Sequence, residues 1–412
     1  MKFLRLSNPR LTLLGLALVV LIGLGFANYH VSLRALGSNA FLPRWEAARQ
    51  WLRHGVDPYD PAVSLAAQEA TYGRPAEPDY GEDLGQFLYP LYAMIFYAPF
   101  AFLPYAIARA IWLTLLEICV LAFAFVAVRL SGWRPKPWLM AVLILFLFGW
   151  YHGFHMVIQT DFAPIEGLLV AGGLLAIQRN NDRAAGILLA LSTVNLQMSW
   201  LVLLFVLVWS LVKRRWQLIR WMAVSTLVLL GISLLLIPNW VVGWLRQIVT
   251  LAKTADVASP IVTIAGIAPT LTLILWRVLA IVLGLHLLLQ WAVAISQGGR
   301  WFQWAAALTI AVGNLLMLRT TSSNYILMFP ALCLVASTWT RRWGNRGDLA
   351  VAIACLISIV GLWVLYLATG SRTPESPLLF LPMPILTIVA LWWTRSWITQ
   401  RTDLTFESAS SS

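Results

Sequence analysis

Long apolar runs recur along nearly the whole of this chain, and they restrict it to structures that a lipid bilayer accepts. Hydrophobic residues make up 60% of the sequence and charged residues only 11%, which excludes an ordinary soluble domain. Because lipid offers no hydrogen-bond partners to the backbone, α-helices are the spanning elements that fit such runs. We therefore predict an all-α polytopic membrane protein, a single domain over residues 1–412, with about 12 transmembrane helices.

Basic residues lie mainly at the ends of the apolar runs. The net charge is +12, with clusters at Lys213–Arg215 and at Arg341, Arg342 and Arg346. This distribution follows the positive-inside rule and favours contact with anionic membrane lipids over nucleic acid. We expect a multi-pass protein of the plasma membrane with both termini cytoplasmic and no nucleic-acid partner.

The alternation of basic stretches and apolar runs predicts the path of the chain. Prolines close the segment 87–103, which indicates a short or re-entrant element, and Asn195 and Gln197 interrupt 184–212, which predicts two short helices. The outer loops expected are 30–86, 239–268 and 370–377, and a disordered polar tail is expected at about 403–412. The remaining expected spans are 11–29, 106–130, 138–150, 163–178, 217–238, 269–295, 301–318, 324–340, 348–369 and 378–396.

The outer loop 30–86 is too long to be a simple connection, which points to a functional role. Apolar residues at 41, 45, 48 and 52 recur at helical spacing, so we predict an amphipathic helix at the membrane surface. Asp57 precedes Pro58, which holds it extended and leaves its carboxylate free to bond backbone amides. A capping role for Asp57 is therefore favoured over catalysis.

Four stretches carry a resemblance to a known family. The first is Gly37–Tyr59, with Asn39, Phe41 and Trp45 followed by Asp57-Pro58-Tyr59. Others are the Tyr89-Pro90 entry to the next apolar segment, the step 190–197, and Asn314 with the later Arg319-Thr320 and Asn324-Tyr325. Together they resemble glycosyltransferase family 87, whose members are membrane enzymes of the GT-C fold.

The resemblance implies a reaction. It implies transfer of a mannose-type hexose from a polyprenyl-phosphate donor to a lipid or glycan acceptor on the outer side, with no cofactor. The chain has no glycine-rich nucleotide-binding loop, which suits a lipid donor better than a nucleotide sugar. The alternative is a non-catalytic polyprenyl-lipid-binding protein, a flippase or a transporter that uses the same pocket.

Two positions depart from the family pattern. Ala40 occupies the place of the aspartate expected to be the catalytic base, and Asn195 replaces a lysine that would bind the donor phosphate. Glu46 is the first fallback base, although other carboxylates of the loop remain open: Asp57, Asp60, Asp79, Glu82 and Asp83. We expect weak turnover, and a gain of at least about tenfold from Ala40→Asp.

The resemblance also implies a binding site. Arg319 has the geometry to hold a phosphate or sugar hydroxyls. We expect the start of the outer loop, the Tyr89 region and several later polar residues to converge on one cavity. The residues expected to bind substrate are Asn39, Arg44, Asp57, Tyr89, Gln159, Asn195, Gln197, Arg319 and Asn324.

The sequence favours no metal site. His152 and His155 are spaced for one helical face, but no third ligand is evident, so they are interpreted as interfacial histidines. Cys119, Cys333 and Cys355 lie within apolar runs and show neither metal nor disulfide spacing. Glu117 is an isolated carboxyl in an apolar run, interpreted as neutral and bonded to a backbone carbonyl.

Overall fold

The computed structural model describes residues 9–34, 40–77, 82–254, 269–316, 321–369 and 376–400. Helices account for nearly all of the regular structure in these ranges, and no strand occurs in them. The all-α prediction is therefore confirmed. The expected polar tail at 403–412 lies outside the described residues.

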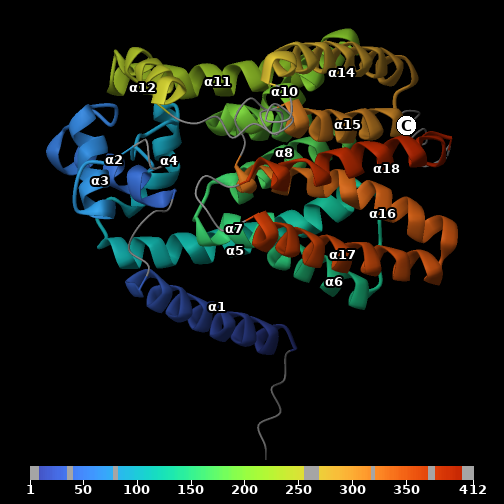
Figure 1. The fold of residues 1–412 in the computed structure, drawn as a ribbon, viewed down its shortest axis with the longest axis horizontal. Coiled ribbons are helices and arrows are strands. Elements are labelled where there is room, and N and C mark those ends of the chain that lie inside the picture. Colours follow the sequence, from blue (N-terminus) through green and yellow to red (C-terminus); the bar gives the residue numbers. More distant parts are fainter. Residues whose placement is uncertain are drawn as a thin grey trace, which may run out of the picture.

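A bundle of long helices forms the larger part of the molecule (Figure 1). Its connected core contains side chains from the second half of α5 and from most of the later helices. The helices of the bundle are α5 (Tyr105–Leu130), α6 (Pro137–Gly149), α7 (Tyr151–Ile158), α8 (Ala163–Gln178), α9 (Asp182–Leu191), α10 (Leu196–Val212), α11 (Trp216–Leu236), α14 (Pro269–Gln297), α15 (Arg300–Leu316), α16 (Phe329–Trp343), α17 (Asn345–Thr369) and α18 (Pro382–Thr399).

The expected outer loop folds into its own helical layer at one end of the bundle, where Figure 1 shows it on the left. The layer contains α2 (Phe41–His54), α3 (Pro61–Tyr72) and the short helical turns η2, α4 and η3 over Leu91–Phe100. Phe41, Trp45 and Ala48 are buried in it, whereas Leu52 is 39% exposed. The predicted helical periodicity is thus present in α2, and the apolar face of this helix packs largely against the rest of the protein.

A second hydrophobic core holds this layer together, separate from the core of the bundle. At its centre the ring of Phe41 stacks on Trp112 of α5, with ring centroids 5.3 Å apart. The indole of Trp45 donates a hydrogen bond to the carbonyl of Phe100 (3.0 Å). Fully buried aromatic side chains of this size contribute most of the packing energy of such a core. The loop is therefore fixed to the first helix that follows it.

Seven helices of the described residues are long and apolar enough to cross a membrane, or eight if α6 and α7 count as one bent span. The axes of α6 and α7 differ by 60°. A 3-10 turn, η4 (Ser192–Asn195), separates α9 from α10 at the predicted interruption, although Asp182–Val212 as a whole still counts as one of the seven candidate spans. The short apolar segment predicted over 87–103 is also present.

Two helices in the expected outer loops were not predicted: α3 in the loop 30–86, and a helix in the loop 239–268. The expected loop 239–268 contains the amphipathic helix α12 (Trp240–Thr254), and residues 255–268 lie outside the described ranges. The indole of Trp244 donates to the carbonyl of Leu88 (2.9 Å), and the Gln247 amide donates to the carbonyl of Tyr59 (3.1 Å). Because its apolar residues alternate with polar ones, the segment has too low a hydropathy to register as a span. It covers the outer layer instead.

The first helix, α1 (Pro9–Arg34), lies along α5 at the edge of the molecule (Figure 1). Within this contact the side-chain amide of Asn28 donates to Glu117 (2.8 Å) and to the hydroxyl of Thr114 (3.0 Å). The prediction that Glu117 bonds a backbone carbonyl was wrong, because its partner is a side chain on another helix. A polar pair of this kind fixes the register of two otherwise apolar helices.

Candidate functional site

Ala40 lies where the layer formed by α2 and α3 meets the bundle. It is the N-cap residue of α2, and its methyl group makes no capping bond. Its backbone N–H donates to the carbonyl of Gln159 at the end of α7 (2.8 Å). One turn further along α2, the guanidinium of Arg44 donates to the carbonyl of Ala40. Three predicted site residues are therefore linked by hydrogen bonds: Ala40 contacts both Arg44 and Gln159.

Arg44 extends over the ring of Tyr89, with its guanidinium carbon 5.1 Å from the ring centroid. Tyr89 stacks in turn on Tyr97 at 6.3 Å. Burial lowers the pKa of Arg44, but Tyr89, Tyr97, Asp83 and Asp161 raise it by more, so the net shift is upward. The guanidinium stays charged, and its Nε atom has no hydrogen-bond partner within the described residues. An arginine in this state is suited to an anionic ligand.

Tyr89 is held neutral by its surroundings. Burial is the main cause that raises the pKa of its phenol, and the nearby Asp161 adds to it. Its backbone carbonyl accepts a hydrogen bond from the hydroxyl of Tyr59 (2.8 Å), and burial likewise raises the pKa of Tyr59. Both phenols therefore act as hydrogen-bond donors at physiological pH.

Asp161 follows Gln159 in the turn between α7 and α8. Its carboxylate is half-buried, and one oxygen accepts a hydrogen bond from the N–H of Ala163 (3.1 Å). It also belongs to the electrostatic surroundings of Arg44, Tyr89 and Tyr97. The turn thus brings a carboxylate to the place where Arg44 brings a cation.

Glu166 is a second carboxyl at this site, and sequence reasoning missed it. It lies in the first turn of α8 and is fully buried. It interacts with the side chain of Ser199 and the backbone of Asn195, although neither contact has close hydrogen-bond geometry. An acidic residue inside the apolar run 163–178 was the available signal, because such residues are costly in a membrane and mark functional sites.

Asn195 is brought to the site by the interaction of its backbone with Glu166 and by a contact of the neighbouring Thr193. Tyr92, from the segment that carries Tyr89, donates its hydroxyl to the side chain and the carbonyl of Thr193 (3.0 and 3.2 Å). The step 190–197 therefore packs against the Tyr89 segment. Gln197, the last residue of this step, lies on α10 and is exposed.

The predicted fallback base and the predicted turn residue have local partners. Glu46 is 9% exposed and accepts a hydrogen bond from Gln50 one turn along α2 (2.6 Å). Asp57 accepts a hydrogen bond from the N–H of Tyr59 (2.9 Å), which is the turn predicted from the proline. Its carboxylate is thus engaged with its own backbone.

The later predicted residues are only partly described. Asn324 is buried in the turn η5 (Ser322–Met328), which packs against α7 and α8. In that turn the ring of Tyr325 stacks on His152 at 4.4 Å, so His152 is part of the packing rather than an exposed histidine. Asn39 and Arg319 lie outside the described residues.

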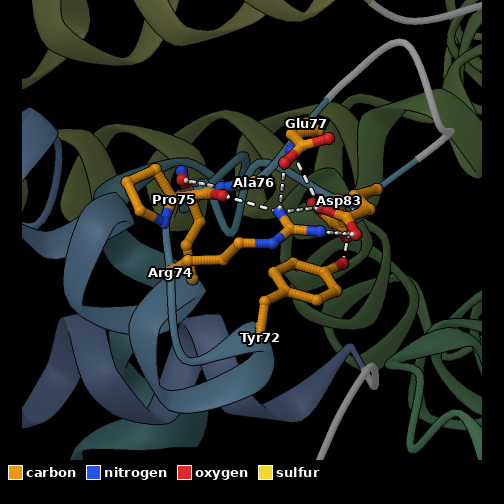
Figure 2. Close-up of polar contacts among 8 residues, drawn as sticks. Tyr72, Arg74, Pro75, Ala76, Glu77 and Asp83 are labelled. Carbon is orange, nitrogen blue, oxygen red and sulfur yellow. Dashed lines mark hydrogen bonds and ion pairs between the residues drawn. The ribbon is translucent and has the colours of Figure 1, made fainter.

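A network of charged residues ties the end of α3 to residues 82–85. Arg74 makes two hydrogen bonds to Glu82 (2.8 and 2.9 Å) and an ion pair with Glu77 (3.3 Å). Figure 2 shows the Arg74 guanidinium at its centre, with Tyr72 and Asp83 beside it. The Arg74 hydrogen bonds lower the pKa of Glu82. Because a lowered pKa weakens a base, Glu82 is a poor candidate for proton abstraction.

Asp83 also has a structural role, because its carboxylate accepts from the N–H of Gly85 (2.9 Å). Asp60 accepts from the N–H of Ala62 (2.8 Å) and caps α3. No group of three or more potential metal ligands occurs within the described residues.

Comparison with known proteins gives the chain a family. The model of glycosyltransferase family 87 matches residues 87–318, more than half of the 412 residues. The chain belongs to glycosyltransferase family 87. No curated protein and no solved structure matches it. This glycosyltransferase is thus a membrane enzyme by family and by its apolar helices.

The range that matches the family includes one side of the site. Tyr89, Gln159, Asp161, Glu166 and Asn195 lie within residues 87–318, whereas α2 with Ala40 and Arg44 precedes them. The candidate site is therefore assembled from the matched region and from a loop before it.

Proposed function

We propose that this glycosyltransferase moves a mannose-type hexose from a polyprenyl-phosphate donor to a lipid or glycan acceptor on the outer side of the membrane. The observation that carries the proposal is the guanidinium of Arg44 over the ring of Tyr89, with the carboxylate of Asp161 in the electrostatic surroundings of both residues. Sugar transfer from a phosphate needs a base at the acceptor hydroxyl and positive charge at the leaving phosphate. The site holds one group of each kind.

Arg44 is the residue proposed to bind the donor phosphate. Its guanidinium carries several N–H donors in a planar fork that matches phosphate oxygens. Asn195 cannot supply the charge of the lysine that the family pattern has at this place, so Arg44 and Arg319 take over that role. A GT-C arrangement with about twelve crossings is part of the proposal, in which the shorter helices α8, α15 and α16 also cross the membrane.

A transfer assay with purified protein in liposomes tests the proposal. Labelled mannosyl-polyprenyl phosphate is offered together with an extract of membrane lipids and glycans from the source cells, and product formation is followed. We expect label in a new product from the polyprenyl donor and none from GDP-mannose. Transfer from GDP-mannose alone would contradict the proposed donor.

The replacement of the expected aspartate by Ala40 favours a second candidate, a polyprenyl-lipid-binding protein or flippase without transferase activity. The same liposomes distinguish the two. Saturable binding of the donor without product, for all sugars offered, would support the second candidate.

The proposed orientation can be measured by cysteine labelling in intact cells. Ser64 would be a natural probe position in the outer loop, but its side chain is only 7% exposed. Ala70, near the end of α3, is exposed and is the better position. We expect Ala70→Cys to react with an impermeant maleimide in intact cells, and Lys213→Cys, in a basic stretch, to react only after permeabilisation. The reverse pattern would invert the topology.

A further inference from the structure

We propose that Asp161 is the general base of this glycosyltransferase and replaces the acid that is absent at Ala40. The inference rests on the proposed function. It names the residue that accepts the proton of the acceptor hydroxyl.

The first argument is position. The N–H of Ala40 bonds the carbonyl of Gln159 at 2.8 Å, and Asp161 is two residues further along the same turn. Position 161 is therefore two residues from a backbone contact with position 40, so a carboxylate at either position starts from the same small region.

The second argument is the construction of the turn. Thr160 has a φ of 56°, a left-handed conformation that a β-branched residue adopts rarely and at a cost. The N–H of Asp161 bonds the carbonyl of Met156 (3.2 Å), and the indole of Trp112 bonds the carbonyl of Thr160 (3.0 Å). The Thr160 hydroxyl donates to the carbonyl of Gln159 (2.6 Å). A strained turn held by this many bonds fixes the direction of Asp161.

The third argument is the state of the carboxylate. One oxygen of Asp161 accepts from the N–H of Ala163, and the residue is half-buried, so it keeps some accessible surface. Arg44 lies close enough to interact with it electrostatically. The proposed base and the proposed phosphate-binding cation are thus near neighbours.

The fourth argument is the state of the other carboxylates. Glu46 is bonded to Gln50 and Glu82 to Arg74. Asp83, which like Asp161 accepts from a backbone N–H, also interacts with Arg44 but is not among the groups that act on Tyr89. Glu166 is fully buried beneath the site. Among the described acids at this end of the molecule, Asp161 combines partial exposure with the electrostatic proximity to Arg44 and Tyr89.

The step balances as follows. The acceptor hydroxyl gives its proton to the Asp161 carboxylate, and the oxygen uses a lone pair to form a bond to the anomeric carbon. The bond from that carbon to the phosphate oxygen breaks, and its electron pair leaves with the polyprenyl phosphate. Arg44 stabilises the negative charge that develops there. Asp161 then releases its proton to water.

Asp161→Asn is a clean test because the side-chain oxygen of asparagine can accept the same hydrogen bond from the N–H of Ala163. The variant keeps the bond to Ala163 and removes the base. In the liposome assay with mannosyl-polyprenyl phosphate we expect kcat to fall by about 10²–10⁴-fold, with donor binding and thermal stability unchanged. Asp60→Asn is the matched control, since the Asp60 carboxylate likewise accepts from the N–H two residues further on and is exposed. It should behave as wild type.

A double variant supplies the second readout. Ala40→Asp in the Asp161→Asn background places a carboxylate at the residue whose backbone contacts Gln159. We expect this double variant to have a kcat at least about tenfold higher than that of Asp161→Asn alone. A merely structural role for Asp161 would not be rescued in this way.

The outcomes separate the two proposals. An active wild type with an equally active Asp161→Asn variant would overturn the role of Asp161 and leave the proposed function standing. An inactive wild type that becomes active with Ala40→Asp alone would also exclude Asp161 as the base. No transfer by the wild type or by the Ala40→Asp variant would contradict the proposed function itself.

Discussion

Replacing Arg44 by alanine should lower the rate of sugar transfer by about 10²–10³-fold, the usual effect of removing one group that stabilises transition-state charge. The reason is its place above Tyr89, where a charged guanidinium has an unpaired Nε within the described residues. Arg44→Lys keeps the charge but loses the planar fork. Its transfer rate should therefore lie between those of the wild type and the Arg44→Ala variant. The measurement is kcat with the polyprenyl-phosphate donor in liposomes.

Arg49 offers the matched control for Arg44. It lies on the same helix, and its guanidinium is 5.0 Å from the ring centroid of Trp45, so it makes a similar contact with an aromatic ring. Arg49→Ala should retain a rate within about twofold of wild type, since a peripheral cation–π contact contributes little. Equal losses for the two variants would show that α2 needs its arginines for folding and would remove Arg44 from the phosphate site.

Gly153→Ala should strongly destabilise the protein. A Cβ atom at this position would lie 1.8 Å from the carbonyl oxygen of Leu147 and 2.5 Å from the indole nitrogen of Trp150. Because the first contact is with the backbone, the bend between α6 and α7 would have to open. Overpacking of this kind costs about 3 kcal/mol or more. We expect a marked fall in the midpoint of thermal unfolding in detergent, or loss of monodisperse protein.

The control for this variant is Gly361→Ala in the middle of α17. No atom lies within 4 Å of the added Cβ at this position. Alanine is favoured over glycine inside a helix by about 0.5–1 kcal/mol, so this variant should be neutral or slightly more stable. If Gly153→Ala also proved neutral, the tight bend between α6 and α7 would not be required for the fold.

The parts of the fold that follow from hydropathy could be predicted from the sequence. Long apolar runs gave the spanning helices, and the polar Asn195 inside such a run gave the break between α9 and α10. The periodicity of residues 41–52 gave α2. Each of these depends on residues close together in the chain, which is why a single sequence suffices.

The parts that depend on distant contacts could not be predicted. The residues around Trp240 do not predict that α12 will cover Tyr59 and Leu88, since those partners lie far away in the chain. The same holds for the site. The resemblance drew attention to Ala40, but the contact of its N–H with Gln159, and hence the importance of Asp161, exists only in three dimensions.

The separation of the two hydrophobic cores bears on how the enzyme responds to its membrane. A thicker or thinner bilayer is met by tilting of the spanning helices, at a cost of fractions of a kcal/mol per Å. The outer core, with Phe41 stacked on Trp112 and Trp45 bonded to Phe100, joins α2 to the start of α5. Arg44 and Tyr89 therefore move with that end of α5 as one body when the bundle tilts. Turnover should accordingly vary little among phosphatidylcholine liposomes of different acyl-chain length.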